Sequence, residues 1–213
     1  EKERLTGEKE TLGFYLKGHP INRYEEELAG IVTSRLNNYK LGNVLVAGYI
    51  MSIRTRTGSR GRMAELRLDD RTARALVNVY SEEYQKYRHL LLKDQLIIVR
   101  GKAVEDDYVE SGMSIRANEI LDLDEIRKHR AALILNINHD YLCNGGMEQL
   151  KQALIPFRHG HSQVYIRYNN QDAIAKLSLG PEWCLTIDDD LLDKLSEVIG
   201  RENVKIEYNT QRL

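Results

Sequence analysis

The chain has few cysteines and no long apolar segment in its 213 residues. Its two cysteines, Cys143 and Cys184, are too few for a disulfide framework or a multi-cysteine zinc site, and they fit a reducing, cytoplasmic setting. No apolar run is long enough for a membrane-spanning helix, and the charged start has no signal-peptide core behind it. We therefore expect a cytoplasmic protein without a membrane partner.

Catalytic and metal-binding constellations are also missing. Asp69 and Asp70 are neighbours at the end of a predicted strand, where adjacent side chains tend to opposite faces, so they more plausibly start a turn than share a metal. Residues 188–190 are three acids that precede a helical pattern, where acids cap the helix and complement its dipole. His159 and His161 have no third ligand at regular spacing, and no glycine-rich phosphate-binding motif occurs. The sequence predicts no catalytic residue, cofactor or metal.

Charge is spread unevenly along a chain whose formal net charge is −1. Residues 41–104 contain twelve lysines and arginines against six acids, whereas residues 131–213 contain eight against eleven. Attraction to a polyanion is therefore expected in the first half, and the two halves are expected to have different partners. The length and a hydrophobic content of 42% favour two compact domains.

The first half alternates apolar and polar residues in segments of strand length. Gly48 interrupts the first segment, and a glycine inside a strand commonly marks a bulge or a tight barrel bend. A helical pattern at residues 81–92 separates the third predicted strand from the fourth. Three strands, a helix and two strands are the order of a five-stranded OB-fold barrel. The predicted strands are 44–53, 64–69, 74–80, 95–104 and 113–120.

A short helical lead-in precedes this barrel, and a smaller domain of the order β-α-β-β-α-β follows it. The whole chain is thus predicted to be an α+β protein. Its predicted parts are the lead-in (1–40, with helices at 7–16 and 22–29), the OB domain (41–122), a helical connector (123–130) and an α/β domain (131–213). In the last part we expect strands at 131–137, 163–168, 173–179 and 204–208, and helices at 146–157 and 188–199.

The segment between the first two predicted strands holds four arginines in nine residues, two glycines at the turn and no acid. It predicts a hairpin tip that projects positive charge beyond the sheet, beside the face on which OB-folds bind nucleic acid. Further cations occupy predicted outward strand positions, and the site requires that all of them lie on one side of the barrel. The predicted nucleic-acid-binding residues are Arg54, Arg56, Arg60, Arg62, Arg67, Arg100, Lys102 and Arg116.

Aromatic residues on which bases could stack are fewer than the cations. Tyr49, Tyr80 and Tyr108 are candidates, although Tyr80 precedes the predicted helix and suits the core equally well. We therefore expect weak, salt-sensitive binding without base readout. Neutralising about three phosphates of a single strand gives a log–log salt slope of roughly −2.

Several strings resemble the C-terminal region of the bacterial DNA polymerase III alpha subunit family. Residues 12–20 read Leu-Gly-Phe-Tyr-Leu-Lys-Gly-His-Pro, a string that is quite specific to that family. Residues 68–72, 84–92 and 96–101 are similar as well. The resemblance covers essentially the whole chain, more loosely after residue 131.

In that family the polymerase active site lies upstream, so the resemblance implies a non-catalytic module. It implies that residues 1–40 end the clamp-binding region, that the OB domain binds single-stranded template DNA, and that residues 131–213 bind the tau subunit of the clamp loader. The sliding clamp is expected to bind mainly through upstream sequence. Residues 203–208 are similar to a hexapeptide proposed as a second clamp contact, but Asn203 and Lys205 depart from it, and we prefer a closing strand.

Two other functions remain open. The OB domain could be a protein-binding spacer whose basic loop contacts an acidic partner. It could also be a tRNA-binding domain of an aminoacyl-tRNA synthetase, because residues 68–72 suit the second turn of that fold. The helical string before the barrel and the absence of a synthetase motif count against the tRNA function.

Overall fold

The computed structural model describes residues 19–59, 61–109, 111–143, 145–169 and 174–209. The chain divides between Leu123 and Asp124 into two compact units, each with its own hydrophobic core. Two sheets with helices beside them confirm the predicted α+β class. The helix predicted at residues 7–16 lies outside the described residues.

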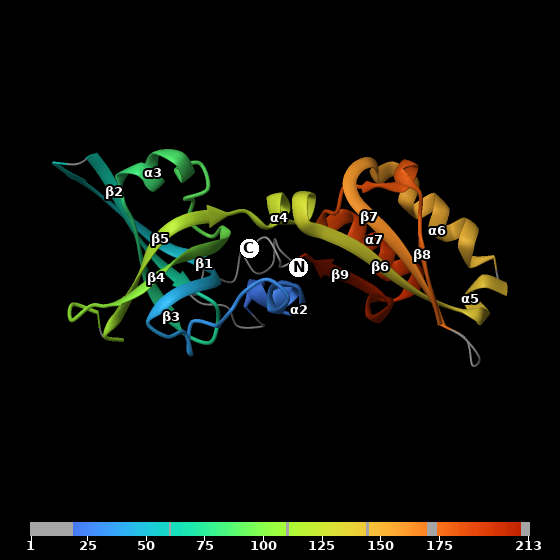
Figure 1. Cartoon of the computed structure of the whole chain (residues 1–213), viewed down its shortest axis with the longest axis horizontal. Coiled ribbons are helices and arrows are strands. Elements are labelled where there is room, and N and C mark those ends of the chain that lie inside the picture. Colours follow the sequence, from blue (N-terminus) through green and yellow to red (C-terminus); the bar gives the residue numbers. More distant parts are fainter. Residues whose placement is uncertain (1–18, 60, 110, 144, 170–173, 210–213) are drawn as a thin grey trace, which may run out of the picture. The chain divides into compact units, whose positions relative to one another are not determined.

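The described part of the first unit starts with a short helical segment and continues into five strands with one helix between the third and fourth (Figure 1). The segment predicted as a helix at 22–29 is a 3-10 turn followed by one short α-helix. The elements are η1 (Pro20–Tyr24), α2 (Glu25–Ala29), β1 (Gly42–Gly58), β2 (Gly61–Asp69), β3 (Arg74–Val79), α3 (Ser81–Tyr87), β4 (Leu96–Glu105) and β5 (Met113–Leu121).

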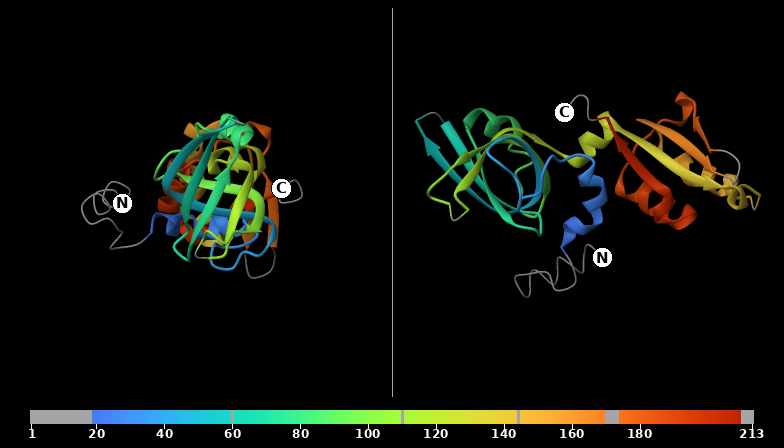
Figure 2. Two further views of the ribbon diagram at one scale, coloured as in Figure 1. Left: turned by 90° about the vertical axis from the view of Figure 1, so that its left-hand side faces the viewer. Right: turned by 60° about the horizontal axis from the view of Figure 1, so that its bottom comes forward.

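The five strands form a closed barrel in the order β1-β2-β3-β5-β4, which confirms the predicted OB-type barrel (Figure 2, left view). Strand β1 closes it by pairing with β4 up to Tyr49 and with β2 from Tyr49 onward. A Cβ atom on Gly48 would lie 3.2 Å from the backbone oxygen of Asp69, so glycine permits the close approach of β2. The irregularity in register falls just beyond it, between Ile50 and Ser52.

The interior of the barrel is filled by every second side chain of its strands. Leu66, Leu68, Val77 and Ile115 are fully buried, which is the alternation that a half-buried strand requires. Helix α3 ends earlier than the predicted residue 92, yet Leu91 beyond its end is still buried in the same core. The helix and the turn after it therefore complete the core together.

The turn between β2 and β3 is organised by Asp70, which is 9% exposed. Its carboxylate accepts hydrogen bonds from the backbone N–H groups of Thr72 (2.9 Å), Ala73 (3.0 Å) and, across the unit, Leu36 (2.8 Å). The neighbouring Asp69 accepts from the side chain of Arg74 at 2.9 Å. The interpretation of this acidic pair as the start of a turn is confirmed.

The second unit is a four-stranded sheet in the order β8-β7-β6-β9, with β6 and β7 parallel. Its core joins Leu133 and Leu135 of β6 to Leu150 of α6 and Leu191 of α7, so these helices pack on one face of the sheet. The predicted β-α-β-β-α-β order is confirmed. The elements are α4 (Leu123–Arg130), β6 (Ala131–Asn138), α5 (His139–Cys143), α6 (Gly146–Leu154), η2 (Ile155–Phe157), β7 (Arg158–Asn169), β8 (Ile174–Ser178), η3 (Pro181–Trp183), α7 (Asp189–Ile199), η4 (Arg201–Asn203) and β9 (Val204–Tyr208).

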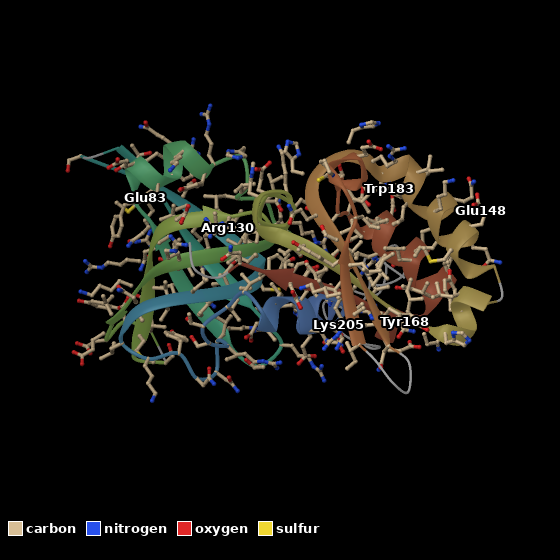
Figure 3. All side chains as sticks on the ribbon, turned by 45° about the vertical axis from the view of Figure 1, so that its right-hand side comes forward. Glu83, Arg130, Glu148, Tyr168, Trp183 and Lys205 are labelled. Atoms are coloured by element: carbon tan, nitrogen blue, oxygen red, sulfur yellow. The ribbon has the colours of Figure 1, made fainter. Side chains whose placement is uncertain are left out.

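A helix cap, an ion pair and a cation–aromatic contact hold the elements of this unit together. The Asp188 carboxylate accepts a hydrogen bond from the backbone N–H of Leu191 at 2.8 Å, which confirms the predicted capping role of the acids before α7. Arg127 of α4, only 1% exposed, forms an ion pair with Asp189 at 2.9 Å. The guanidinium of Arg158 lies 4.7 Å from the ring centre of Trp183, which packs against the core and is labelled in Figure 3.

We predict that Asp70→Ala destabilises the first unit by about 3 kcal/mol, because it leaves the buried N–H of Leu36 and the partly buried N–H groups of Thr72 and Ala73 without an acceptor. Urea unfolding followed by NMR resonances of the barrel measures this loss. The exposed Asp107→Ala is the matched control and is expected to change the free energy of unfolding by less than about 0.5 kcal/mol. Equal effects of the two substitutions would contradict the role of Asp70.

Candidate nucleic-acid interface

The arginine-rich segment forms a paired two-stranded arm rather than a loop. Strands β1 and β2 stay in register as far as the pair Gly58 and Gly61, and Figure 1 shows this hairpin extending past the rest of the barrel. Arg54 and Arg56 therefore lie on β1 and Arg62 lies on β2. Arg60, predicted as part of the same group, lies outside the described residues.

The register of this arm separates its arginines. Arg54 pairs with Glu65 and Arg56 with Met63, whereas Arg62 pairs with Thr57. Because successive side chains of a strand point to opposite faces, Arg62 lies on the face opposite to Arg54 and Arg56. The expectation that the hairpin arginines share one side is wrong for Arg62.

Arg62 is held on its own face by helix α3. Its guanidinium carbon lies 5.8 Å from the ring centre of Tyr84, and its Nη2 donates to the Thr55 hydroxyl at 3.4 Å. A cation over an aromatic ring is stabilised by the negative face of the ring. Sequence reasoning overlooked Tyr84 as a partner of the arm, because the helical spacing of Tyr84 and Tyr87 indicated only a core-facing stripe.

The remaining outward cations are connected by one row of neighbouring strand positions around the barrel. Arg54 pairs with Glu65, Glu65 with Asn78, Asn78 with Arg116, and Arg116 with Lys102. Arg67 lies on the same outward side of β2, two residues from Glu65. We call this surface the basic face, and it consists of Arg54, Arg56, Arg67, Lys102 and Arg116.

Most of the basic face is not neutralised from within the described residues. The side chains of Arg54, Arg67, Lys102 and Arg116 are exposed and have no carboxylate partner there. Arg56 reaches Glu65 only at 4.0 Å and remains 70% exposed. Exposed pairs at this distance contribute little, so the positive charge stays available to a ligand.

Arg100 differs from the other predicted cations. Its Nη1 lies 2.9 Å from a carboxylate oxygen of Glu119 on the adjacent strand, and both side chains are about one-third exposed. This ion pair neutralises its charge. The sequence could not separate Arg100 from Lys102, because both occupy outward positions of β4 and only the register with β5 brings Glu119 opposite Arg100.

Two of the three tyrosines predicted to stack on bases are exposed. Tyr80 is 41% exposed and follows the buried Val79, so it has the same outward parity as Asn78. Tyr108 in the β4–β5 loop is 101% exposed. The third candidate, Tyr49, is less accessible, with its ring packed edge-on against His19 at 5.7 Å. Asn78, which sequence reasoning missed, donates to the Ser114 hydroxyl at 3.3 Å in the centre of the row.

Among the described residues, no three or more His, Cys, Asp or Glu side chains gather as a metal ion would require. In the same part of the chain, no helix is long and apolar enough to cross a membrane. The ring of His161 instead lies beside that of His129, 6.4 Å away.

Two family models match parts of this chain, and one of them covers the barrel. Residues 44–123 match the family model described as an OB-fold nucleic acid binding domain. Residues 149–200 match the model described as DNA polymerase III subunit alpha, C-terminal domain. The barrel therefore belongs to the OB-fold class, and the unit that follows it is similar to the C-terminal domain of a polymerase subunit.

Curated relatives match nearly the whole chain. DNA polymerase III subunit alpha of Vibrio cholerae is 37% identical over 215 residues, which cover 98% of this chain and 18% of the relative. The same subunit of Escherichia coli is 35% identical over 98% of this chain, and that of Pseudomonas aeruginosa is 34% identical over 97%. This chain is related to the C-terminal region of the bacterial DNA polymerase III alpha subunit.

The match spans only about 18% of the length of these relatives. The match includes their C-terminal domain, whose model covers residues 149–200 of this chain.

Solved structures of other proteins align with part of this chain. An asparaginyl-tRNA synthetase of Pyrococcus horikoshii aligns with a TM-score of 0.35 and 16% identity over 42% of this chain and 22% of its own. The protein described as the second single-stranded DNA binding protein of Mycobacterium smegmatis aligns with a TM-score of 0.34 and 16% identity. The alignment covers 39% of this chain and 90% of that protein.

We predict that Gly101→Ala disturbs the basic face, because a Cβ atom at Gly101 would overlap the backbone carbonyl of Arg116 on the neighbouring strand. Moving the two strands apart is expected to cost about 1–3 kcal/mol. Urea unfolding followed by barrel resonances measures it. The control is Gly58→Ala, whose new Cβ would meet nothing closer than 3.6 Å and which is expected to have a smaller effect.

Proposed function

We propose that the chain is a non-catalytic module of a replicative DNA polymerase that binds single-stranded template DNA through its OB domain, residues 41–122. The observation that supports this most is the basic face, a row of unneutralised cations on an OB barrel. Its outward cations suit the regularly spaced phosphates of a strand. The proposal agrees with the relatives, which are DNA polymerase subunits.

The chemistry of this face favours contact with the DNA backbone over base readout. Arginines and a lysine form charge-assisted hydrogen bonds to phosphate, and these contacts carry no sequence information. Tyr80 and Tyr108 supply exposed rings for stacking, each worth about 1–3 kcal/mol per base. We therefore expect sequence-tolerant binding that weakens steeply with salt.

In this proposal, only some of the predicted cations bind phosphate. Arg54, Arg56, Arg67, Lys102 and Arg116 of the basic face bind phosphate. Arg62 positions the hairpin through Tyr84, and Arg100 is occupied by Glu119. Arg60 stays a predicted contact at the hairpin turn.

The double variant Arg54→Gln/Arg67→Gln is expected to weaken binding to fluorescent oligothymidine about tenfold at low salt. Because each phosphate contact of a single strand contributes about 0.7 to the log–log salt slope, the slope should become shallower by about 1.4. Fluorescence anisotropy over a range of salt concentrations measures both quantities.

The matched control is Arg62→Gln/Arg100→Gln, which removes the same charge from positions off the basic face or already paired. A loss equal to that of the first variant would contradict the basic face as the binding surface. Glu65→Gln, which removes the carboxylate that pairs with Arg54 in the row, should raise affinity about twofold. Competition by tRNA as strong as that by single-stranded DNA would favour the tRNA-binding alternative instead.

We further propose that the second domain, residues 131–213, binds the tau subunit of the clamp loader. The proposal rests on the family relationship and on the independent core of this unit, which gives it a surface of its own. The closing strand preferred for residues 204–208 is confirmed as β9, paired with β6. A sliding-clamp contact is assigned mainly to upstream sequence.

Residues 124–213 alone are expected to bind purified tau with an affinity within about threefold of that of the whole chain, because the core clusters of the two units are separate. Biolayer interferometry with immobilised tau measures this. The whole chain with Arg54→Gln/Arg67→Gln is the control and should bind tau unchanged. Loss of tau binding in that variant would favour the alternative in which the OB domain is itself a protein-binding spacer.

A further inference from the structure

The second unit contains a pocket that the proposed functions do not use. It lies where the parallel strands β6 and β7 end, and its volume is about 400 Å³. In α/β sheets, ligands commonly bind outside the carboxyl ends of parallel strands. Its polar lining consists of Asn136, Asn138, Arg167, Asn169, Asn203 and Lys205, without an acidic residue among the described lining.

Strand register explains how these residues meet. On the face of the sheet not covered by α6 and α7, Asn136 of β6 pairs with Arg167 of β7, and Asn138 pairs with Asn169. Lys205 of β9 pairs with Ile134, which lies two residues before Asn136 on β6 and on the same face. Neighbouring strands are about 4.8 Å apart, so long side chains of β7 and β9 can converge above β6. Figure 3 labels Lys205 and Tyr168, which belong to these two strands.

Two of the three cations that the structure describes on this face are not neutralised. Lys176 of β8 is paired with Glu207 at 3.3 Å and lies 4.5 Å from the ring centre of Tyr165. Arg167 and Lys205 are exposed, and neither has a carboxylate partner within the part of the chain that the structure describes. This local excess of positive charge occurs in a domain whose sequence carries a net −3.

The amide side chains and a tyrosine add hydrogen-bond donors. The side-chain oxygen of Asn138 accepts from the backbone N–H of Tyr141 at 2.9 Å, which leaves its NH₂ group as a donor. The hydroxyl of Tyr141, which also lines the pocket, is buried and has no partner among the described residues. Burial raises the pKa of Tyr141, so this hydroxyl stays protonated at neutral pH.

We propose that this pocket binds an oxyanion, a phosphate group or a carboxylate, between the guanidinium of Arg167 and the ammonium of Lys205. The planar fork of an arginine matches both anions with two parallel hydrogen bonds, and the lysine supplies a second, flexible charge. Ile137, Ile174 and Ile199 form the apolar part of the wall, so the anion belongs to a ligand that also has an apolar portion.

The test uses the whole, isotope-labelled chain with inorganic phosphate and, separately, glutarate, at constant ionic strength. We expect saturable NMR shifts at the backbone amides of Asn138, Asn169 and Lys205. Shifts with phosphate alone identify a phosphate ligand, shifts with glutarate alone identify a carboxylate, and shifts with both support the shared chemistry. Absence of saturable shifts with either anion would overturn the proposal.

Arg167→Gln/Lys205→Gln is expected to weaken anion binding at least about tenfold, since it removes both charges. The matched control Lys151→Gln/Lys194→Gln removes the same charge from α6 and α7 and should leave the shifts unchanged. Equal shifts in the two double variants would also overturn the site. Because neither DNA nor tau is present, failure here leaves the proposed functions untouched, and their failure leaves this site untouched.

Discussion

The first unit depends on one strand that pairs with two partners. Because β1 leaves β4 at Tyr49 and continues along β2, the barrel closes and the same strand runs on into the hairpin. The pairing of β1 determines which side chains of β2, β3 and β5 point outward, since register fixes the face on which each side chain lies. An added Cβ atom would be tight at Gly48, and at Gly101 it would overlap the neighbouring backbone.

Strand register also places the arginines of one sequence segment on two different surfaces. Arg54 and Arg62 belong to one arginine-rich segment, yet they face opposite sides of the hairpin and have different neighbours. Conversely, Arg54 and Arg116 are far apart in sequence and belong to one row. A count of charges along the chain therefore measures how much positive potential the barrel has, whereas strand pairing decides where a nucleic acid would encounter it.

The sequence was sufficient for the order of strands and helices, because apolar alternation and helical spacing depend on local residues. The barrel, the β-α-β-β-α-β order, the Asp70 turn and the Asp188 cap were all predictable in this way. The separation of Arg62, the Glu119 partner of Arg100 and the contribution of Tyr84 were not, since each depends on which residue a neighbouring strand or helix brings opposite. The oxyanion pocket was missed for the same reason, as its asparagines and cations come from β6, β7, β9 and the turn before β9.

The chain has a single tryptophan, Trp183, and it packs against the core of the second unit beneath the guanidinium of Arg158. Intrinsic tryptophan fluorescence is consequently a reporter of that unit alone, while melting of the barrel is optically silent at those wavelengths. A midpoint obtained by fluorescence therefore describes the second unit, and unfolding of the barrel needs a separate probe.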